Sequence, residues 1–77
     1  MQIQITLHGI LRDALPPEAR GRTALTLPAG ATVADALLAL QLKNTTTAAI
    51  NGQQVPLDYI LHDGDHLHLF RPIGGGR

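Results

Sequence analysis

The stretch Met1-Gln2-Ile3-Gln4-Ile5-Thr6-Leu7-His8 alternates strictly between apolar and polar side chains after its first residue. Successive side chains of a β-strand point to opposite faces of a sheet, so the apolar residues here share one face and the polar residues the other. His66-Leu67-His68-Leu69-Phe70 repeats the pattern later in the chain, with its two leucines on one side. Both stretches predict strands with one buried and one polar face.

Two further segments extend this sheet. Residues 23–27 alternate in the same way and end at Pro28-Ala29-Gly30, and residues 47–50 predict a short third strand. Asn51-Gly52 follows that strand and is typical of a type I′ turn, which needs positive φ at both central residues. Pro56 makes residues 55–61 irregular or a brief turn, since proline cannot donate to a sheet ladder.

A single helix is predicted between the second and third strands. Thr32 is suited to the N-cap, and Asp35 occupies the reciprocal position of a capping box. Residues 34–42 are rich in Ala, Leu and Gln and favour helix. The residues that share one face at helical spacing, and should pack on the sheet, are Val33, Ala36, Leu37 and Leu40. The order strand, strand, helix, strand, strand predicts an α+β fold, with one sheet and one helix packed on it.

The composition excludes several classes of protein. At 77 residues the chain holds one domain, and its six basic and six acidic residues cancel. Bulk charge therefore attracts neither nucleic acid nor an anionic membrane. We find no signal-peptide pattern and no apolar run of about 18 residues, so a cytoplasmic protein is expected. Because cysteine is absent, any covalent chemistry must use a group other than a thiol.

Gly74-Gly75-Gly76-Arg77 follows the last predicted strand. Glycine has no Cβ, so a glycine run passes through narrow channels, but holding it still costs much entropy. We therefore expect a folded domain over residues 1–73 and a flexible tail over residues 74–77, mobile in the free protein beyond Ile73. The tail is either a frayed terminus or a segment offered to a partner.

Three motifs in order give the chain a resemblance to a known family. They are Ile50-Asn51-Gly52, then Leu61-His62-Asp63-Gly64-Asp65, then Phe70-Arg71-Pro72-Ile73-Gly74-Gly75-Gly76. With the order of elements they resemble the MoaD/ThiS family of ubiquitin-like sulfur carriers over the whole chain. The resemblance implies a ubiquitin-like β-grasp fold: a mixed sheet, one main helix on one face, paired first and last strands, and a flexible glycine tail.

The resemblance also implies a chemistry for the tail. In the family, a ubiquitin-activating-type adenylating enzyme uses ATP to join the terminal glycine carboxylate to AMP, and sulfur then replaces AMP to give a thiocarboxylate. Gly76 takes this role here, while Gly74 and Gly75 would let the tail thread to the nucleotide. The protein would be a co-substrate and no enzyme. It would need no bound cofactor and would donate sulfur in cofactor or amino-acid biosynthesis or in tRNA thiolation. The acceptor would be an enzyme such as a molybdopterin synthase large subunit, thiazole synthase or cysteine synthase.

One residue departs from the family pattern. Arg77 follows Gly76, so the Gly76 carbonyl is tied up in a peptide bond and cannot be adenylated as written. Some relatives carry extra residues that a JAMM-type zinc metalloprotease removes. Arg77 is therefore interpreted as a proform residue that is trimmed before activation.

Other residues carry partner or metal hypotheses. Phe70 on a polar face suggests a contact site, with partial burial under the tail as the alternative, and Arg71, Pro72 and Ile73 complete the predicted partner-binding segment. His66 and His68 share a strand face that His8 could approach. Two ligands on one strand are too few without a third, and cysteine is absent, so these histidines are expected to face solvent and no metal site is predicted. The carboxylates of residues 63 and 65 are interpreted as turn residues rather than an acid-base pair, and Tyr59 as a core-edge residue.

Three functional hypotheses remain open from the sequence. The first is a sulfur carrier activated at Gly76. The second is a ubiquitin-like modifier joined through Gly76 to lysines of other proteins, which requires the same activation. The third is a non-covalent interaction module that keeps Arg77 and never reacts.

Overall fold

A computed structural model of the chain describes residues 1–43 and 46–71. The predicted tail over residues 74–77, and with it the expectation that it is mobile, lies outside the described residues, as do Pro72 and Ile73.

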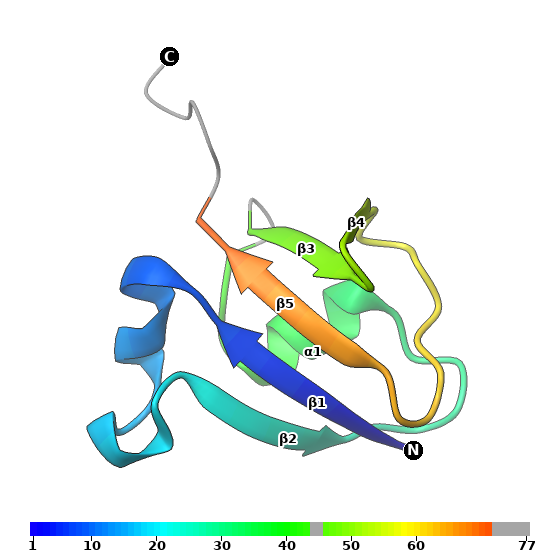
Figure 1. The fold of residues 1–77 in the computed structure, drawn as a ribbon. Helices are drawn as coiled ribbons and strands as arrows, with labels where there is room; N and C mark the ends of the chain where they lie inside the picture. Colours follow the sequence, from blue (N-terminus) through cyan, green and yellow to red (C-terminus); the bar gives the residue numbers. More distant parts are fainter. Residues whose placement is uncertain (44–45, 72–77) are drawn as a thin grey trace.

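Five strands form one mixed sheet, with a single α-helix on one side (Figure 1). The elements in chain order are β1 (Gln2–Leu7), the 3₁₀-helices η1 (Gly9–Ala14) and η2 (Pro17–Ala19), β2 (Arg22–Thr26), α1 (Val33–Ala39), β3 (Thr47–Ile50), β4 (Gln53–Val55) and β5 (His66–Phe70). The strand order is β2-β1-β5-β3-β4, with β1 and β5 parallel and the other pairs antiparallel. The predicted pairing of the first and last strands is confirmed.

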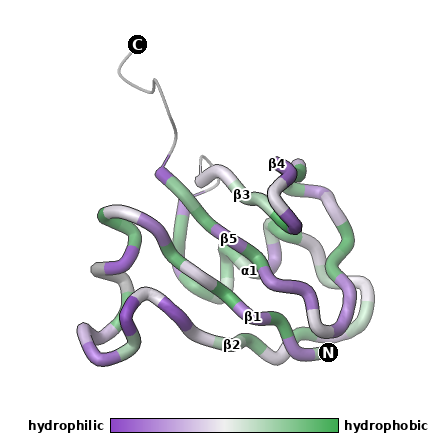
Figure 2. The backbone as a smooth tube through the Cα atoms, in the orientation of Figure 1, coloured by the Kyte–Doolittle hydropathy of each residue, from purple (hydrophilic) through white to green (hydrophobic). Residues whose placement is uncertain are grey.

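The core lies between α1 and one face of the central strands. The Ile and Leu residues of β1 and β5, and Val33, Ala36 and Leu37 of α1, are almost fully buried. The colours of Figure 2 alternate along β1 and β5, as the period-two pattern requires. Leu40, predicted on the buried helix face, and Tyr59 are partly buried and pack against the edge of this core.

The start of the helix is as predicted. Thr32 accepts a hydrogen bond from the Asp35 backbone N–H at 3.3 Å, and the Asp35 carboxylate accepts one from the Thr32 N–H at 2.9 Å. This reciprocal pair is a capping box, which satisfies two of the backbone N–H groups that a helix leaves without intrahelical partners.

The end of the helix differs from the prediction, because α1 stops at Ala39 rather than Leu42. Gln41 adopts a left-handed conformation with φ of 60°. The Gln41 N–H donates to the Leu38 carbonyl at 3.1 Å, and the Leu42 N–H donates to the Leu37 carbonyl at 2.9 Å. These two bonds form a Schellman motif, which brings the chain back so that Leu42 packs against the core. The usual signal for this ending is glycine, and glutamine occupies the position here.

A second difference is β4, a short strand that the sequence pattern did not predict. Asn51 and Gly52 both have positive φ, 54° and 80°, as a type I′ hairpin requires. The hairpin is therefore confirmed, and it continues into β4, where Gln53 pairs with Ile50. The two glutamines of β4 are exposed and have little strand preference, so their pairing follows from the turn rather than from side-chain burial.

No helix in the described part of the chain is long and apolar enough to cross a membrane.

Candidate functional site

The face of the sheet opposite α1 carries a row of polar and aromatic side chains over its two central strands. β1 and β5 lie side by side in parallel register, with Thr6 opposite His68 (Figure 1). Alternation places Thr6 on this side of β1, and His66, His68 and Phe70 on this side of β5. His8 follows β1, and its backbone N–H donates to the Leu69 carbonyl at 3.0 Å, which holds it beside the end of β5.

Four aromatic rings form a continuous row on this face. The rings of His66 and His68 stack with centroids 4.4 Å apart, and the His8 and His68 centroids lie 5.2 Å apart. The His8 ring in turn stacks on Phe70, with a centroid distance of 4.4 Å and an interplanar angle of 10°. We call His66, His68, His8 and Phe70 the ring row. Arg71 follows Phe70 at the end of this row.

Hydrogen bonds fix the imidazoles within the ring row. Nε2 of His8 lies 2.9 Å from Nδ1 of His68, and Nε2 of His66 lies 2.6 Å from Oγ1 of Thr6. One nitrogen of the His8–His68 pair donates its proton to the other, so that bond requires one acceptor nitrogen without a proton. His8 does approach the two histidines of β5. Nevertheless, no group of three or more side chains suited to a metal ion occurs within residues 1–43 and 46–71.

The electrostatics of the ring row favour uncharged imidazole at its centre. Burial lowers the pKa of His68 below its ordinary value of 6.5, and the neighbouring His66 and then His8 lower it further. These effects favour the neutral form of His68, at the centre of the row.

Phe70 lies at the end of the ring row. Its side chain is half-buried, and its ring is held in place by His8. Arg71 is exposed at the root of the tail. Whether either residue contacts a partner stays a prediction. The remaining site residues named from the sequence, Pro72, Ile73, Gly74, Gly75, Gly76 and Arg77, lie outside the described residues.

The carboxylates of the 63–65 turn bind backbone groups. Asp63 accepts a hydrogen bond from the Gln2 N–H at 2.7 Å, and Asp65 accepts one from the His62 N–H at 2.8 Å. The turn role is therefore confirmed for Asp65, whereas Asp63 binds the start of β1.

Comparison with known proteins decides the family. The profile described as the ThiS family matches residues 5–76, a span that reaches the last glycine of the tail. The chain belongs to the ThiS family. Its members are small carrier proteins rather than catalytic enzymes, and they work with an activating enzyme and a sulfur acceptor.

Solved structures agree on the β-grasp fold of this ThiS-family chain. The crystal structure of small archaeal modifier protein 1 from Haloferax volcanii has a TM-score of 0.75 at 23% identity, covering 94% of this chain and 98% of that one. The solution structure of the Haloferax volcanii HVO 2177 protein gives 0.78 at 21% identity, covering 99% and 87%. A candidate molybdopterin converting factor subunit 1 from Pyrococcus furiosus gives 0.75 at 20% identity, covering 94% and 98%. No significant match was found among curated proteins.

Proposed function

We propose that this ThiS-family protein is a sulfur carrier whose Gly76 carboxylate is adenylated and converted to a thiocarboxylate. The observation that carries the proposal is the family match through residue 76, which includes the glycine run after β5. The absence of cysteine fits this chemistry, because sulfur is carried on the chain's own carbonyl carbon.

The proposed reaction has two steps. An oxygen of the Gly76 carboxylate attacks the α-phosphorus of ATP and pyrophosphate leaves, which turns a poor electrophile into an acyl adenylate. A sulfide equivalent then attacks the carbonyl carbon, and the bond to the AMP oxygen breaks. With hydrosulfide as the donor no atom changes oxidation state. The catalytic groups and the ATP site belong to the adenylating enzyme, which we place with its carrier in the cytoplasm, where ATP is available.

Arg77 must be removed before the first step. An amide carbonyl at Gly76 has no carboxylate oxygen to attack ATP, and Arg77 follows Gly76 in this sequence. We propose that a protease of the JAMM metalloprotease class cleaves the Gly76–Arg77 bond.

Docking is proposed to use the ring row and the segment that follows it. Phe70 is the one phenylalanine of the chain, and it stands on the open face beside the root of the tail. A partner that covers Phe70 and Arg71 therefore also receives Pro72, Ile73 and the glycines. The acceptor that later takes the sulfur, such as a molybdopterin synthase large subunit, thiazole synthase or cysteine synthase, is expected to use the same face.

Mass spectrometry of three chains tests the proposal. A chain ending at Gly76, incubated with its cell's adenylating enzyme, ATP and a sulfide donor, should gain the adenylate and then exchange one oxygen for sulfur. The chain that retains Arg77 should stay unmodified. Gly76→Ala in the shortened chain should react poorly, because its methyl group narrows the approach to the nucleotide. Equal reaction of the full-length and shortened chains would contradict the need for trimming, and an inert shortened chain would contradict the carrier function.

A second candidate is a protein modifier, favoured by the similarity in fold to small archaeal modifier protein 1. It needs the same adenylate, followed by attack of a lysine amine that forms an isopeptide. Detection of lysine isopeptides without any thiocarboxylate would select this candidate. A non-covalent interaction module would retain Arg77 and show neither product.

A further inference from the structure

Charge is segregated between the two ends of the sheet, although the net charge is zero. The lysine and arginine residues of the described chain all lie where β1 and β5 end, at the root of the tail: Arg12, Arg20, Arg22, Lys43 and Arg71. Four acidic residues lie around the opposite end, in the loops near the start of β5 and in the first turn of α1: Asp35, Asp58, Asp63 and Asp65. Asp13 and Glu18 are the acidic residues of the basic end.

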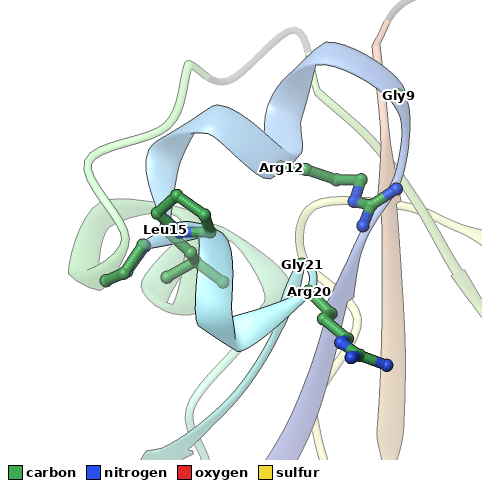
Figure 3. Close-up of a pocket in the computed structure, with 7 residues that line it drawn as sticks. Gly9, Arg12, Leu15, Arg20 and Gly21 are labelled. Carbon is green, nitrogen blue, oxygen red and sulfur yellow. The ribbon is translucent and has the colours of Figure 1, made fainter.

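Three of these arginines gather at one corner, where η1 and η2 connect β1 to β2. Arg12, Arg20 and Arg22 line an open hollow of about 400 Å³ together with His8. Arg12 and Arg20 also line the adjoining hollow, of about 460 Å³, and Figure 3 shows their side chains extending to the same side of this connection. We call Arg12, Arg20 and Arg22 the arginine corner.

The local backbone holds the arginine corner in place. Gly21 is buried with φ of 75°, and its carbonyl accepts a hydrogen bond from the Leu7 N–H at 2.6 Å. A Cβ at Gly21 would lie 2.8 Å from the Leu7 carbonyl oxygen and 2.9 Å from Cγ of Arg12, so the stem of Arg12 packs directly over the glycine. Arg20 has φ of 55°, a left-handed conformation that is unfavourable for a residue with a Cβ. Arg20 and Arg22 therefore flank a turn whose backbone conformation is closely restricted.

The arginine corner has no partner of opposite charge among the described side chains. Among the described side chains, the one close approach of a basic group to a carboxylate is that of His62 Nδ1 to Asp65, 3.7 Å apart, at the opposite end of β5. Three guanidinium groups on one surface repel one another, and each offers a planar fork that matches the two oxygens of a carboxylate. A carboxylate-rich surface would relieve that repulsion.

The position of the arginine corner indicates which ligand supplies the carboxylates. His8 lines the hollow and at the same time stacks on Phe70, so the corner continues the face proposed for docking. We propose that the arginine corner binds a carboxylate-rich segment of the protein that activates Gly76. This inference rests on the proposed function. It adds that the opposite charges at the two ends of the molecule orient the tail toward that partner before contact.

The main test distinguishes the effect of charge at the arginine corner from the effect of net charge. The variant is Arg20→Gln/Arg22→Gln in the chain ending at Gly76, with Arg12 kept because its stem packs on Gly21. The matched control, Gln53→Glu/Gln54→Glu, changes net charge by the same amount on exposed residues of β4, the opposite edge strand. We expect the KM of the adenylating enzyme to rise about tenfold for the variant at low salt, with kcat within about twofold and the defect shrinking at high salt. The control should stay within about twofold of the parent.

An unchanged KM for the arginine variant, or an equal rise for the control, would overturn the proposal. If the parent chain is not adenylated at all, the proposed function fails, and the corner is tested by NMR titration of the free protein with a hexaglutamate peptide. We expect amide shifts at residues 6–8 and 20–22 that Arg20→Gln/Arg22→Gln abolishes. Shifts spread over the molecule, or tighter binding of inorganic phosphate at the same residues, would reject a carboxylate-rich protein segment as the occupant.

Discussion

The two faces of β1 and β5 are built from alternate residues of the same strands, yet they have different roles. The helix side of β1 and β5 carries only Ile and Leu, each no more than 1% exposed. The open side carries threonine, histidines and Phe70, which contact one another through ring stacking and hydrogen bonds. Because side chains alternate strictly, the helix side can specify the fold while the open side varies for recognition.

Substitution of adjacent residues in β5 tests this division most strongly. Leu67 is fully buried, so Leu67→Ala should lower the free energy of unfolding by about 2–5 kcal/mol, a large share of the stability of a domain of this size. The neighbouring His68→Ala should cost about 1 kcal/mol or less, because it removes one imidazole bond and ring contacts at a half-buried site. Urea denaturation of both variants measures the contrast, and equal losses would show that both faces stabilise the fold alike.

Alanine substitutions at two turn glycines distinguish the cost of backbone strain from the cost of a steric clash. Gly21→Ala should destabilise the protein by about 2–3 kcal/mol, because it adds a positive-φ penalty to a Cβ clash with the Leu7 carbonyl. Gly52→Ala meets the same φ penalty with open space around the Cβ, so about 1 kcal/mol is expected. Similar melting temperatures for the two variants would contradict the close packing at the arginine corner.

Phe70→Ala tests whether the open face binds the adenylating enzyme. Binding to the adenylating enzyme should weaken by about 1 kcal/mol or more, the usual threshold for an energetically important interface residue. Calorimetric titration gives the affinity and urea denaturation the stability. Unchanged affinity with a large loss of stability would instead assign Phe70 to the core.

The smallest effect expected is a pH dependence of stability that originates in the ring row. The folded pKa of His68 lies below 6.5, so between those two pKa values the unfolded chain binds more protons than the folded one. The contribution of His68 to the free energy of unfolding is fully present above pH 6.5. It is lost as the pH falls from there through the folded pKa. Denaturation midpoints across this range should fall more steeply for the parent than for His68→Gln. Parallel curves for the parent and His68→Gln would contradict the role of this cluster.

The sequence predicted those features that depend on alternation and on specific turn chemistry. The faces of β1 and β5, the Thr32–Asp35 capping box and the Asn51-Gly52 hairpin all follow from local patterns, and each is confirmed. The end of α1 did not follow, because residues 40–42 are good helix formers and the Schellman motif places glutamine where glycine is usual. β4 was missed because pairing, and not burial, orders its glutamines.

Part of the candidate site was also predictable from strand alternation. Strand alternation placed His66, His68 and Phe70 on one face, and the likeness to a family suggested that His8 is near them. The arginine corner was not predicted, because it depends on two left-handed residues and on Arg12 packing over Gly21, which no periodic pattern encodes.

The intact mass of the protein isolated from its own cells tests most directly whether Gly76 carries the chemistry. We expect a chain that ends at Gly76, with a fraction in which one carboxylate oxygen is replaced by sulfur. A population that consists only of chains retaining Arg77, with no thiocarboxylate under conditions of active sulfur transfer, would contradict it.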